Sequence, residues 1–178
     1  MSPPSQTHAL ILSAISLSLL LLVNSPLPTT ATSQLIESVC NQTSISSSKC
    51  VKLLESDPRS SSATNLHDLA KVVLEAAITN STDSLSFINK MLKNNSTEPI
   101  KKCAFWYEAV VGSFNSALKE LDEDIETANY DVKIAGDDAN NCETSIASSG
   151  VKIPSISSRN DIIKLYSDIL FVITNKLD

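Results

Sequence analysis

Apolar residues recur along much of this chain at alternating steps of three and four positions, the spacing that marks one face of a helix. The pattern runs without a break over 99–121 and again over 124–147. Its first series is Ile100, Cys103, Tyr107, Val110, Phe114, Ala117 and Leu121. Its second series is Ile125, Ala128, Val132, Ala135, Ala139, Cys142 and Ile146. Seven-residue repeats of this kind predict two helices that pack against each other at a shallow angle.

Two further stretches carry the same spacing and complete a bundle. Residues 64–93 predict one long helix that can bend at the polar patch 80–83, with apolar positions at Leu66, Ala70, Val73, Ala77, Leu85, Ile88 and Leu92. Residues 160–177 predict the last helix, opened by the capping residues of "SSRND" and lined by Ile162, Tyr166, Ile169, Ile173 and Leu177. No alternating β pattern interrupts them, and the connections "NNSTEP", "DED" and "SSGVKIPSISS" are short. We therefore predict an all-α fold with an up-and-down four-helix bundle over 63–178.

Residues 34–62 predict a separate helical extension ahead of the bundle. The pieces "QLIESVC" and "KCVKLLESD" each suit a short helix, and the serine-rich "NQTSISSS" joins them. The following "DPRSSS" combines proline with small polar residues and is expected to break the helix. The extension is thus predicted to be a helical hairpin, and 34–178 to be one domain.

The first 33 residues have the character of a signal peptide. Ala9–Val23 is an uncharged apolar run of 15 residues, too short for a comfortable membrane span. Small residues follow it and suit cleavage near Ala31 or Ser33. The mature protein is therefore expected to be secreted and to have no membrane segment.

The net charge of −6 belongs entirely to the mature part, because Glu37 is the first charged residue. An acidic domain disfavours nucleic acid and anionic lipid surfaces as partners. It favours a basic protein partner.

Four cysteines in an oxidising compartment predict two disulfides: Cys40, Cys50, Cys103 and Cys142. Counting alone allows three pairings. In an antiparallel pair of helices, however, positions 103 and 142 lie equally far from the turn at "DED" and on the inward stripes. This geometry selects Cys103–Cys142 and leaves Cys40–Cys50. Cys103 is then a structural cross-link rather than a reactive thiol, and the neighbouring Trp106 is expected to be buried.

Sequons for N-glycosylation occur at Asn41, Asn80, Asn94 and Asn95, the last two overlapping. They are candidate glycan sites in a secreted protein.

Catalytic, cofactor-binding and metal-binding residues are not indicated. His67 is the single histidine of the mature part and has no second ligand one turn away. The sequence has no nucleophile elbow and no glycine-rich phosphate loop. Two groups of acidic residues are expected to have structural roles. The first group complements the dipole at a helix N-terminus and consists of Asp122, Glu123, Asp124 and Glu126. The second lies on a solvated helix face and consists of Asp137 and Asp138. No enzyme is therefore expected, and a secreted, cross-linked bundle without catalytic groups is typical of a binding module.

Taken in order, several short segments resemble the plant invertase/pectin methylesterase inhibitor family over 34–178. They are "IESVC", Cys50-x-x-x-Leu54, "SDPRSSSATNLHDLA", Cys103-x-x-x-Tyr107, "DDANN" followed by "CE", and the final "LFVITNKL". The resemblance implies a helical hairpin on a four-helix bundle, with disulfides joining the first to the second and the third to the fourth cysteine. It also implies a protein inhibitor of the cell wall or vacuole, without a cofactor. Some members cover the substrate cleft of pectin methylesterase, others block acid invertase, and certain pollen allergens are related.

Two departures from the family pattern bear on the target. The Pro-Lys-Phe element associated with invertase inhibition is absent, and "IETANYD" occupies that region. Gly136 and Asp137 in "KIAGDDANN" are expected to loosen the helix there. We therefore favour pectin methylesterase as the target and the cell wall as the location, and assign no contact residue. The alternatives are an acid invertase inhibitor and a storage or allergen-type bundle without an enzyme target. Burial of both Trp106 and Tyr130 would weaken the inhibitor interpretation.

Overall fold

The computed structural model describes residues 30–177, so the predicted signal peptide 1–33 lies outside the described residues except at its end. The chain divides into two units, 1–31 and 32–178. Within the described range all regular structure is helical. The helices are α2 (Thr30–Cys40), α3 (Ser47–Glu55), α4 (Pro58–Ser62), α5 (Leu66–Asn94), α6 (Glu98–Glu120), α7 (Ile125–Ser148) and α8 (Pro154–Thr174).

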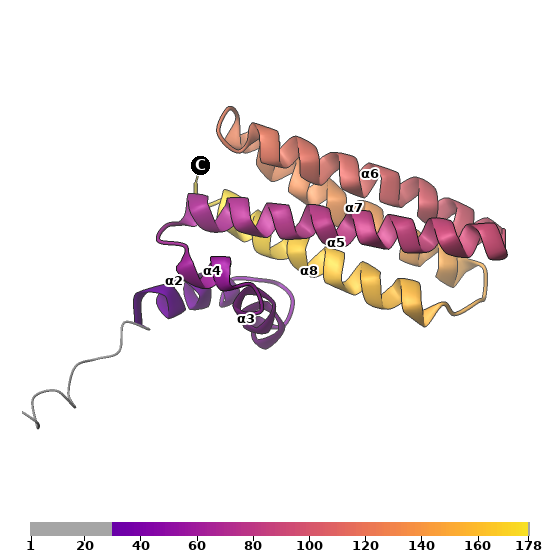
Figure 1. The fold of residues 1–178 in the computed structure, drawn as a ribbon, viewed down its shortest axis with the longest axis horizontal. Coiled ribbons are helices and arrows are strands. Elements are labelled where there is room, and N and C mark those ends of the chain that lie inside the picture. The colour runs from indigo at the N-terminus through magenta and orange to yellow at the C-terminus, as the bar shows by residue number, and fades with distance from the viewer. Residues whose placement is uncertain (1–29, 178) are drawn as a thin grey trace, which may run out of the picture. The chain divides into compact units, whose positions relative to one another are not determined.

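The four long helices form the bundle that the sequence predicts. α5 packs against α6, α6 against α7, α7 against α8, and α8 returns to α5. Each helix runs antiparallel to the one before it because the connections are short (Figure 1). The all-α class and the up-and-down topology are thereby confirmed. Within the described range, no helix combines the length and apolar character that a membrane span requires.

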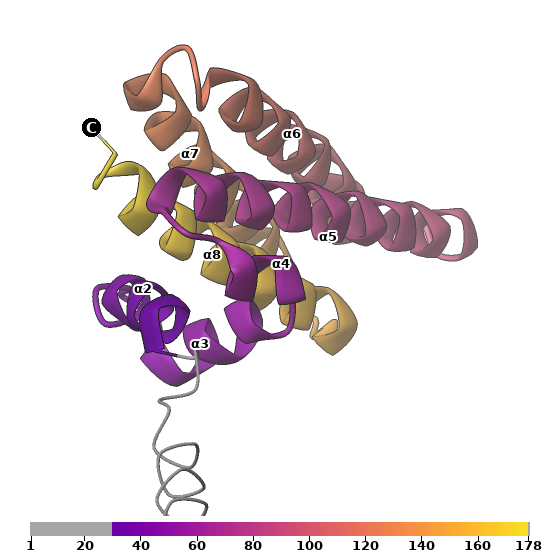
Figure 2. The same ribbon diagram turned by 60° about the vertical axis from the view of Figure 1, so that its left-hand side comes forward.

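The three short helices lie along the side of the bundle formed by α5 and α8, away from α6 (Figures 1 and 2). The helix α3 ends at Glu55, directly before "DPRSSS", as the sequence predicts, but this segment also forms a short helix of its own, α4. Asp57 accepts a hydrogen bond from the Arg59 backbone N–H, and Pro58 occupies the first turn, where no N–H is needed. The same residues therefore separate α3 from α5 and start a short helix.

The predicted apolar stripes supply much of the core, although Leu66, Leu85 and Leu92 of the α5 stripe are only half-buried. All seven positions of the α6 stripe are buried, and so are six of the seven on α7, with Ile125 half-buried. On α5 the stripe continues through the polar patch, where Ser81 and Ser84 take the inward positions and are almost fully buried. Small hydroxyl residues thus continue the packing face where apolar residues are lacking.

The start and the inner face of α8 differ from the prediction. The helix begins at Pro154, about six residues early, because proline suits the first turn and the following serines do not interrupt a helix. The inward positions include Ile156, Asn160 and Ile163, which are fully buried. Ile162, expected to face the core, is 40% exposed.

α7 continues without interruption through Gly136 and Asp137, the residues that the sequence predicts to loosen the helix. The helix runs from Ile125 to Ser148, and Gly136 is buried where α7 meets α8. A Cβ built at this position would overlap Ser167 Oγ and lie 2.8 Å from Ser167 Cβ. The glycine therefore permits a close approach of two helices.

Candidate protein-binding surface

Two disulfides cross-link the protein, one within the bundle and one within the N-terminal extension. The structure joins Cys103 of α6 to Cys142 of α7, with the Cα atoms 4.5 Å apart. It also joins Cys40 to Cys50, with the Cα atoms 5.5 Å apart, and closes the α2–α3 hairpin. These are the pairs that the spacing along the chain selects. Because all four residues are fully buried, none of them offers a reactive thiol at the surface.

A buried polar network lies beside the Cys103–Cys142 disulfide. The Tyr107 hydroxyl of α6 donates to Asn160 Oδ1 of α8 over 2.9 Å. The amide of Asn160 donates to Glu143 of α7 over 2.7 Å, and the Ser157 hydroxyl donates to the same carboxylate over 2.8 Å. Burial raises the pKa of the Tyr107 phenol, so this group stays a neutral donor. The network connects three helices and fixes their register.

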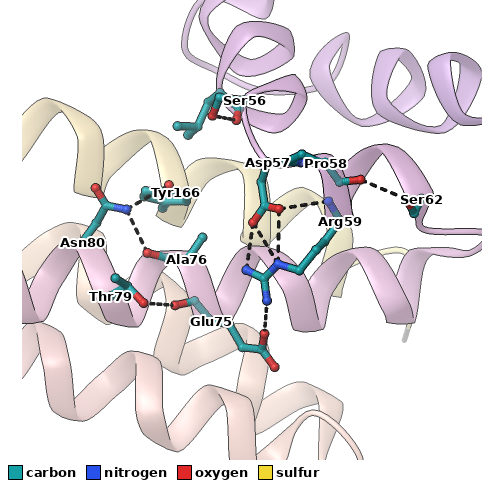
Figure 3. A network of polar contacts seen from close by, with 11 residues as sticks. Ser56, Asp57, Pro58, Arg59, Ser62, Glu75, Ala76, Thr79, Asn80 and Tyr166 are labelled. Atoms are coloured by element: carbon teal, nitrogen blue, oxygen red, sulfur yellow. Dashed lines mark hydrogen bonds and ion pairs between the residues drawn. The ribbon is translucent and has the colours of Figure 1, made fainter.

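An ion-pair network fastens α4 to the bundle (Figure 3). The guanidinium of Arg59 donates to both oxygens of Asp57, at 2.8–3.2 Å, and to Glu75 of α5 over 2.6 Å. The hydrogen bonds from Arg59 lower the pKa of the Asp57 carboxyl, against a weaker opposing effect of burial. Arg59 therefore connects the cap of α4 to the side of α5.

A second anchor holds the α2–α3 loop against α8. Asp168 accepts hydrogen bonds from the Ser44 hydroxyl and from the backbone N–H of Ile45, each over 2.9 Å. These residues border a hollow of about 440 Å³ that Lys133, Gly136 and Lys164 also line. No pattern in the sequence indicates this contact, because 123 residues separate Ile45 from Asp168.

The four sequons occupy different environments. The Asn80 side-chain amide is half-buried within α5 and donates to the Ala76 carbonyl over 2.9 Å and to Tyr166 Oη of α8 over 3.1 Å (Figure 3). Asn41 is exposed after α2, and Asn94 and Asn95 are exposed where α5 ends. The structure thus leaves three of the four amides open to solvent.

The acidic residues divide into structural roles. Asp124 caps α7 by accepting from the Thr127 N–H and hydroxyl, which lowers the pKa of its carboxyl. Asp137 is exposed and pairs with Lys133 over 3.2 Å, as a solvated face requires. Asp138 contradicts that expectation, since it is only 8% exposed and burial raises the pKa of its carboxyl. Asp138 is buried because it lies next to the inward-facing apolar stripe of α7.

His67 has a structural contact rather than a metal partner. Its Nε2 lies 2.7 Å from Asp122 Oδ1, which connects the first turn of α5 to the α6–α7 turn. Within residues 30–177, no group of histidine, cysteine and carboxylate side chains is arranged to hold a metal ion.

Exposed aromatic side chains on α6 and α7 are the features suited to binding another molecule. Phe105 and Tyr130 are each 63% exposed. Trp106, expected to be buried, is half-buried and packs against the core. Since α6 and α7 are antiparallel, Phe105 and Tyr130 lie toward opposite ends of the pair, about 15 Å apart along it. They mark two separate surfaces rather than one.

The sequence matches a known protein family over most of its length. A family model described as plant invertase/pectin methylesterase inhibitor matches residues 34–172. The chain belongs to this family. Its proteins are inhibitors and not enzymes, in agreement with the lack of catalytic groups in the sequence. No curated protein matches the chain significantly.

Solved structures of the family share the fold. A mutant form A of a pectin methylesterase inhibitor from Arabidopsis is 23% identical, with a TM-score of 0.71, and the alignment covers 79% of this chain and 95% of that one. A pectin methylesterase inhibitor from Arabidopsis thaliana is 24% identical, with a TM-score of 0.62, and the alignment covers 82% and 97%. At this level of identity the similarity establishes the arrangement of the helices.

Proposed function

We propose that this protein is a secreted inhibitor of pectin methylesterase that binds the enzyme one-to-one and covers its substrate cleft. Membership of the inhibitor family over 34–172 carries the proposal, and both solved structures described above are pectin methylesterase inhibitors. Inhibition of this kind is steric and needs a rigid surface rather than catalytic groups. The disulfide between α6 and α7 and the buried Tyr107–Asn160 contact supply that rigidity.

Within the bundle, we assign the contact to the surface around Tyr130. This ring is 63% exposed near the start of α7. The exposed acids Asp122, Glu123, Asp124 and Glu126 precede it on the α6–α7 turn and the first turn of α7. An exposed aromatic side chain that follows four exposed carboxylates along the chain suits a basic protein surface. Binding should therefore weaken as the salt concentration rises.

A titration of the oxidised protein against a plant pectin methylesterase and an acid invertase, at mildly acidic pH, tests the proposal. We expect stoichiometric loss of methylesterase activity. Tyr130→Ala should weaken this inhibition about tenfold or more, whereas Val151→Ala, at an exposed apolar residue on the α7–α8 connection, should not. Full inhibition by the Tyr130 variant would contradict the assignment of the contact surface. A wild-type protein that does not inhibit methylesterase would contradict the proposed target.

The second candidate is inhibition of acid invertase, since the family includes inhibitors of both enzymes. Loss of invertase activity alone would show that residues 125–131 can serve without the Pro-Lys-Phe element. No effect on either enzyme would favour a secreted bundle without an enzyme target. Secretion to the cell wall, in preference to the vacuole, is part of the same proposal. It is supported by the apolar run Ala9–Val23 and is tested by locating the protein expressed with residues 1–33.

A further inference from the structure

The second aromatic surface, around Phe105, has the opposite electrostatic character to the one around Tyr130. A hollow of about 460 Å³ lies between α6 and α7 and is lined by Glu98, Lys101, Lys102, Phe105, Trp106 and Ser145. Two lysines and one carboxylate give it a local positive charge on a protein whose net charge is −6. We propose that this hollow binds an acidic oligosaccharide, specifically the de-esterified polyuronate that pectin methylesterase leaves behind.

The aromatic part of the hollow suits a sugar ring. Phe105 is 63% exposed, and its ring meets the Trp106 ring edge-on, with centroids 5.1 Å apart and planes 71° apart. The two rings therefore form a corner in which most of Phe105 is open to solvent. The C–H groups on one side of a pyranose ring pack against such faces. Trp106 is also anchored against the core, so the corner is preformed and little ordering is needed on binding.

The lysines supply the selectivity for acid. The Lys101 side chain is 53% exposed and makes only a long contact with Glu98, at 4.0 Å. Lys102 is exposed, and no carboxylate among the described residues pairs with it. Each ammonium group can therefore donate to a uronate carboxylate without breaking a strong ion pair. Repulsion from distant carboxylates is weak, because charges are screened within about 8 Å at physiological salt.

The choice of a polyuronate rests on the proposed function, because hydrolysis of methyl esters in pectin produces carboxylates next to the inhibited enzyme. The hollow lies on the opposite end of the α6–α7 pair from Tyr130. An inhibitor that binds the product with this end would be retained where methylesterase has already acted.

Trp106 is the only tryptophan of the chain, so its fluorescence reports directly on this hollow. We would titrate the oxidised protein with an unesterified galacturonate oligomer and with the same oligomer fully methyl-esterified. A saturable change is expected with the acid form and not with the ester. Lys101→Gln/Lys102→Gln and Phe105→Ala should each weaken binding about tenfold or more. Glutamine keeps the helix propensity of lysine, so the double variant should fold.

Lys90→Gln/Lys93→Gln is the matched control. It removes two charges from a hollow that Thr82, Leu85, Ser86, Asn89, Lys90 and Lys93 line without an aromatic residue. This variant should bind the oligomer like the wild type. The inference would be overturned if the acid oligomer gave no saturable response or if the ester bound with equal affinity. It would also be overturned if the control variant lost as much affinity as the Lys101/Lys102 variant. The methylesterase titration is independent: inhibition without oligomer binding leaves the proposed function standing, and oligomer binding without inhibition leaves only the sugar site.

Discussion

Gly136 of α7 lies so close to Ser167 of α8 that a Cβ on the glycine would overlap the serine hydroxyl. Gly136→Ala should therefore destabilise the protein by about 1–3 kcal/mol, because neither helix can move aside freely. Gly112 is the control, since it lies in α6 and a Cβ added there would meet no heavy atom within 4 Å. Gly112→Ala should stabilise by about 0.8 kcal/mol through helix propensity. Urea unfolding of both variants measures the contrast, and shifts of the same sign would contradict it.

Removing the Asp168 carboxylate should release the α2–α3 loop without unfolding the bundle. Asp168→Ala loses the hydrogen bonds from Ser44 and Ile45, which together contribute about 1–3 kcal/mol to holding the loop. Hydrogen exchange should accelerate in residues 41–50 and stay slow in α6 and α7. Asp161→Ala serves as the control because this exposed α8 carboxylate pairs with Lys164 on its own helix. Equal exchange in the two variants would show that the loop does not depend on Asp168.

Asp138→Asn should stabilise the protein at neutral pH, by up to about 1 kcal/mol, or a rise in Tm of about 2–4 °C. Burial raises the pKa of this carboxyl, so its charged form is costly in the folded state. As the pH falls through the raised pKa, the folded wild type takes up a proton and the cost disappears. The advantage of the variant should therefore shrink in acid. Asp137→Asn, at the exposed neighbour, should show no such pH-dependent gain.

The disulfides should differ in what their removal affects. In the chain-entropy model, bridges across 39 and 10 residues contribute about 4 and about 3 kcal/mol. Cys103→Ala/Cys142→Ala should lower the global free energy of unfolding, since it frees two bundle helices. Cys40→Ala/Cys50→Ala should chiefly accelerate hydrogen exchange in α2 and α3. A global loss that is larger for the second pair would contradict this division.

Glycosylation should avoid Asn80. A glycan on its amide nitrogen would displace the hydrogen bond to Tyr166 and push α5 from α8. The exposed amides at Asn94 and Asn95 have no such conflict. Glycopeptide mass spectrometry of the protein secreted from plant cells should find a glycan in the 94–97 segment and none on Asn80. A folded, secreted form that carries a glycan on Asn80 would refute the prediction.

The parts of the structure that the sequence could predict depend on repetition or symmetry along the chain. The stripes of α6 and α7 repeat every seven residues, and Cys103 and Cys142 are symmetric about one turn. Both follow from the geometry of helices. The start of α8 could not be placed, because serine-rich residues suit a cap and a helix interior alike.

The contacts that position the extension and the candidate binding surface correspond to no repeat or symmetry in the sequence. Arg59 and Glu75, and likewise Ile45 and Asp168, are single polar residues that tertiary packing brings together. Asp138 follows Asp137 in a polar stretch, which suggests a solvated residue. Its position on α7 nevertheless faces the protein interior, and the side chain is buried. The exposure of Phe105 and Tyr130 depends on how wide each helix–helix contact is, which periodicity alone does not specify.

The anchor at Asp168 also has a consequence for the order in which this chain is made. Cys40 and Cys50 can pair soon after both have been synthesised, because only 10 positions separate them along the chain. The carboxylate that anchors its loop comes from α8, and Asp168 follows Ser44 by 124 residues. The loop of the hairpin therefore lacks this anchor until α8 has been synthesised. The α2–α3 hairpin can therefore be cross-linked long before its anchor on α8 exists.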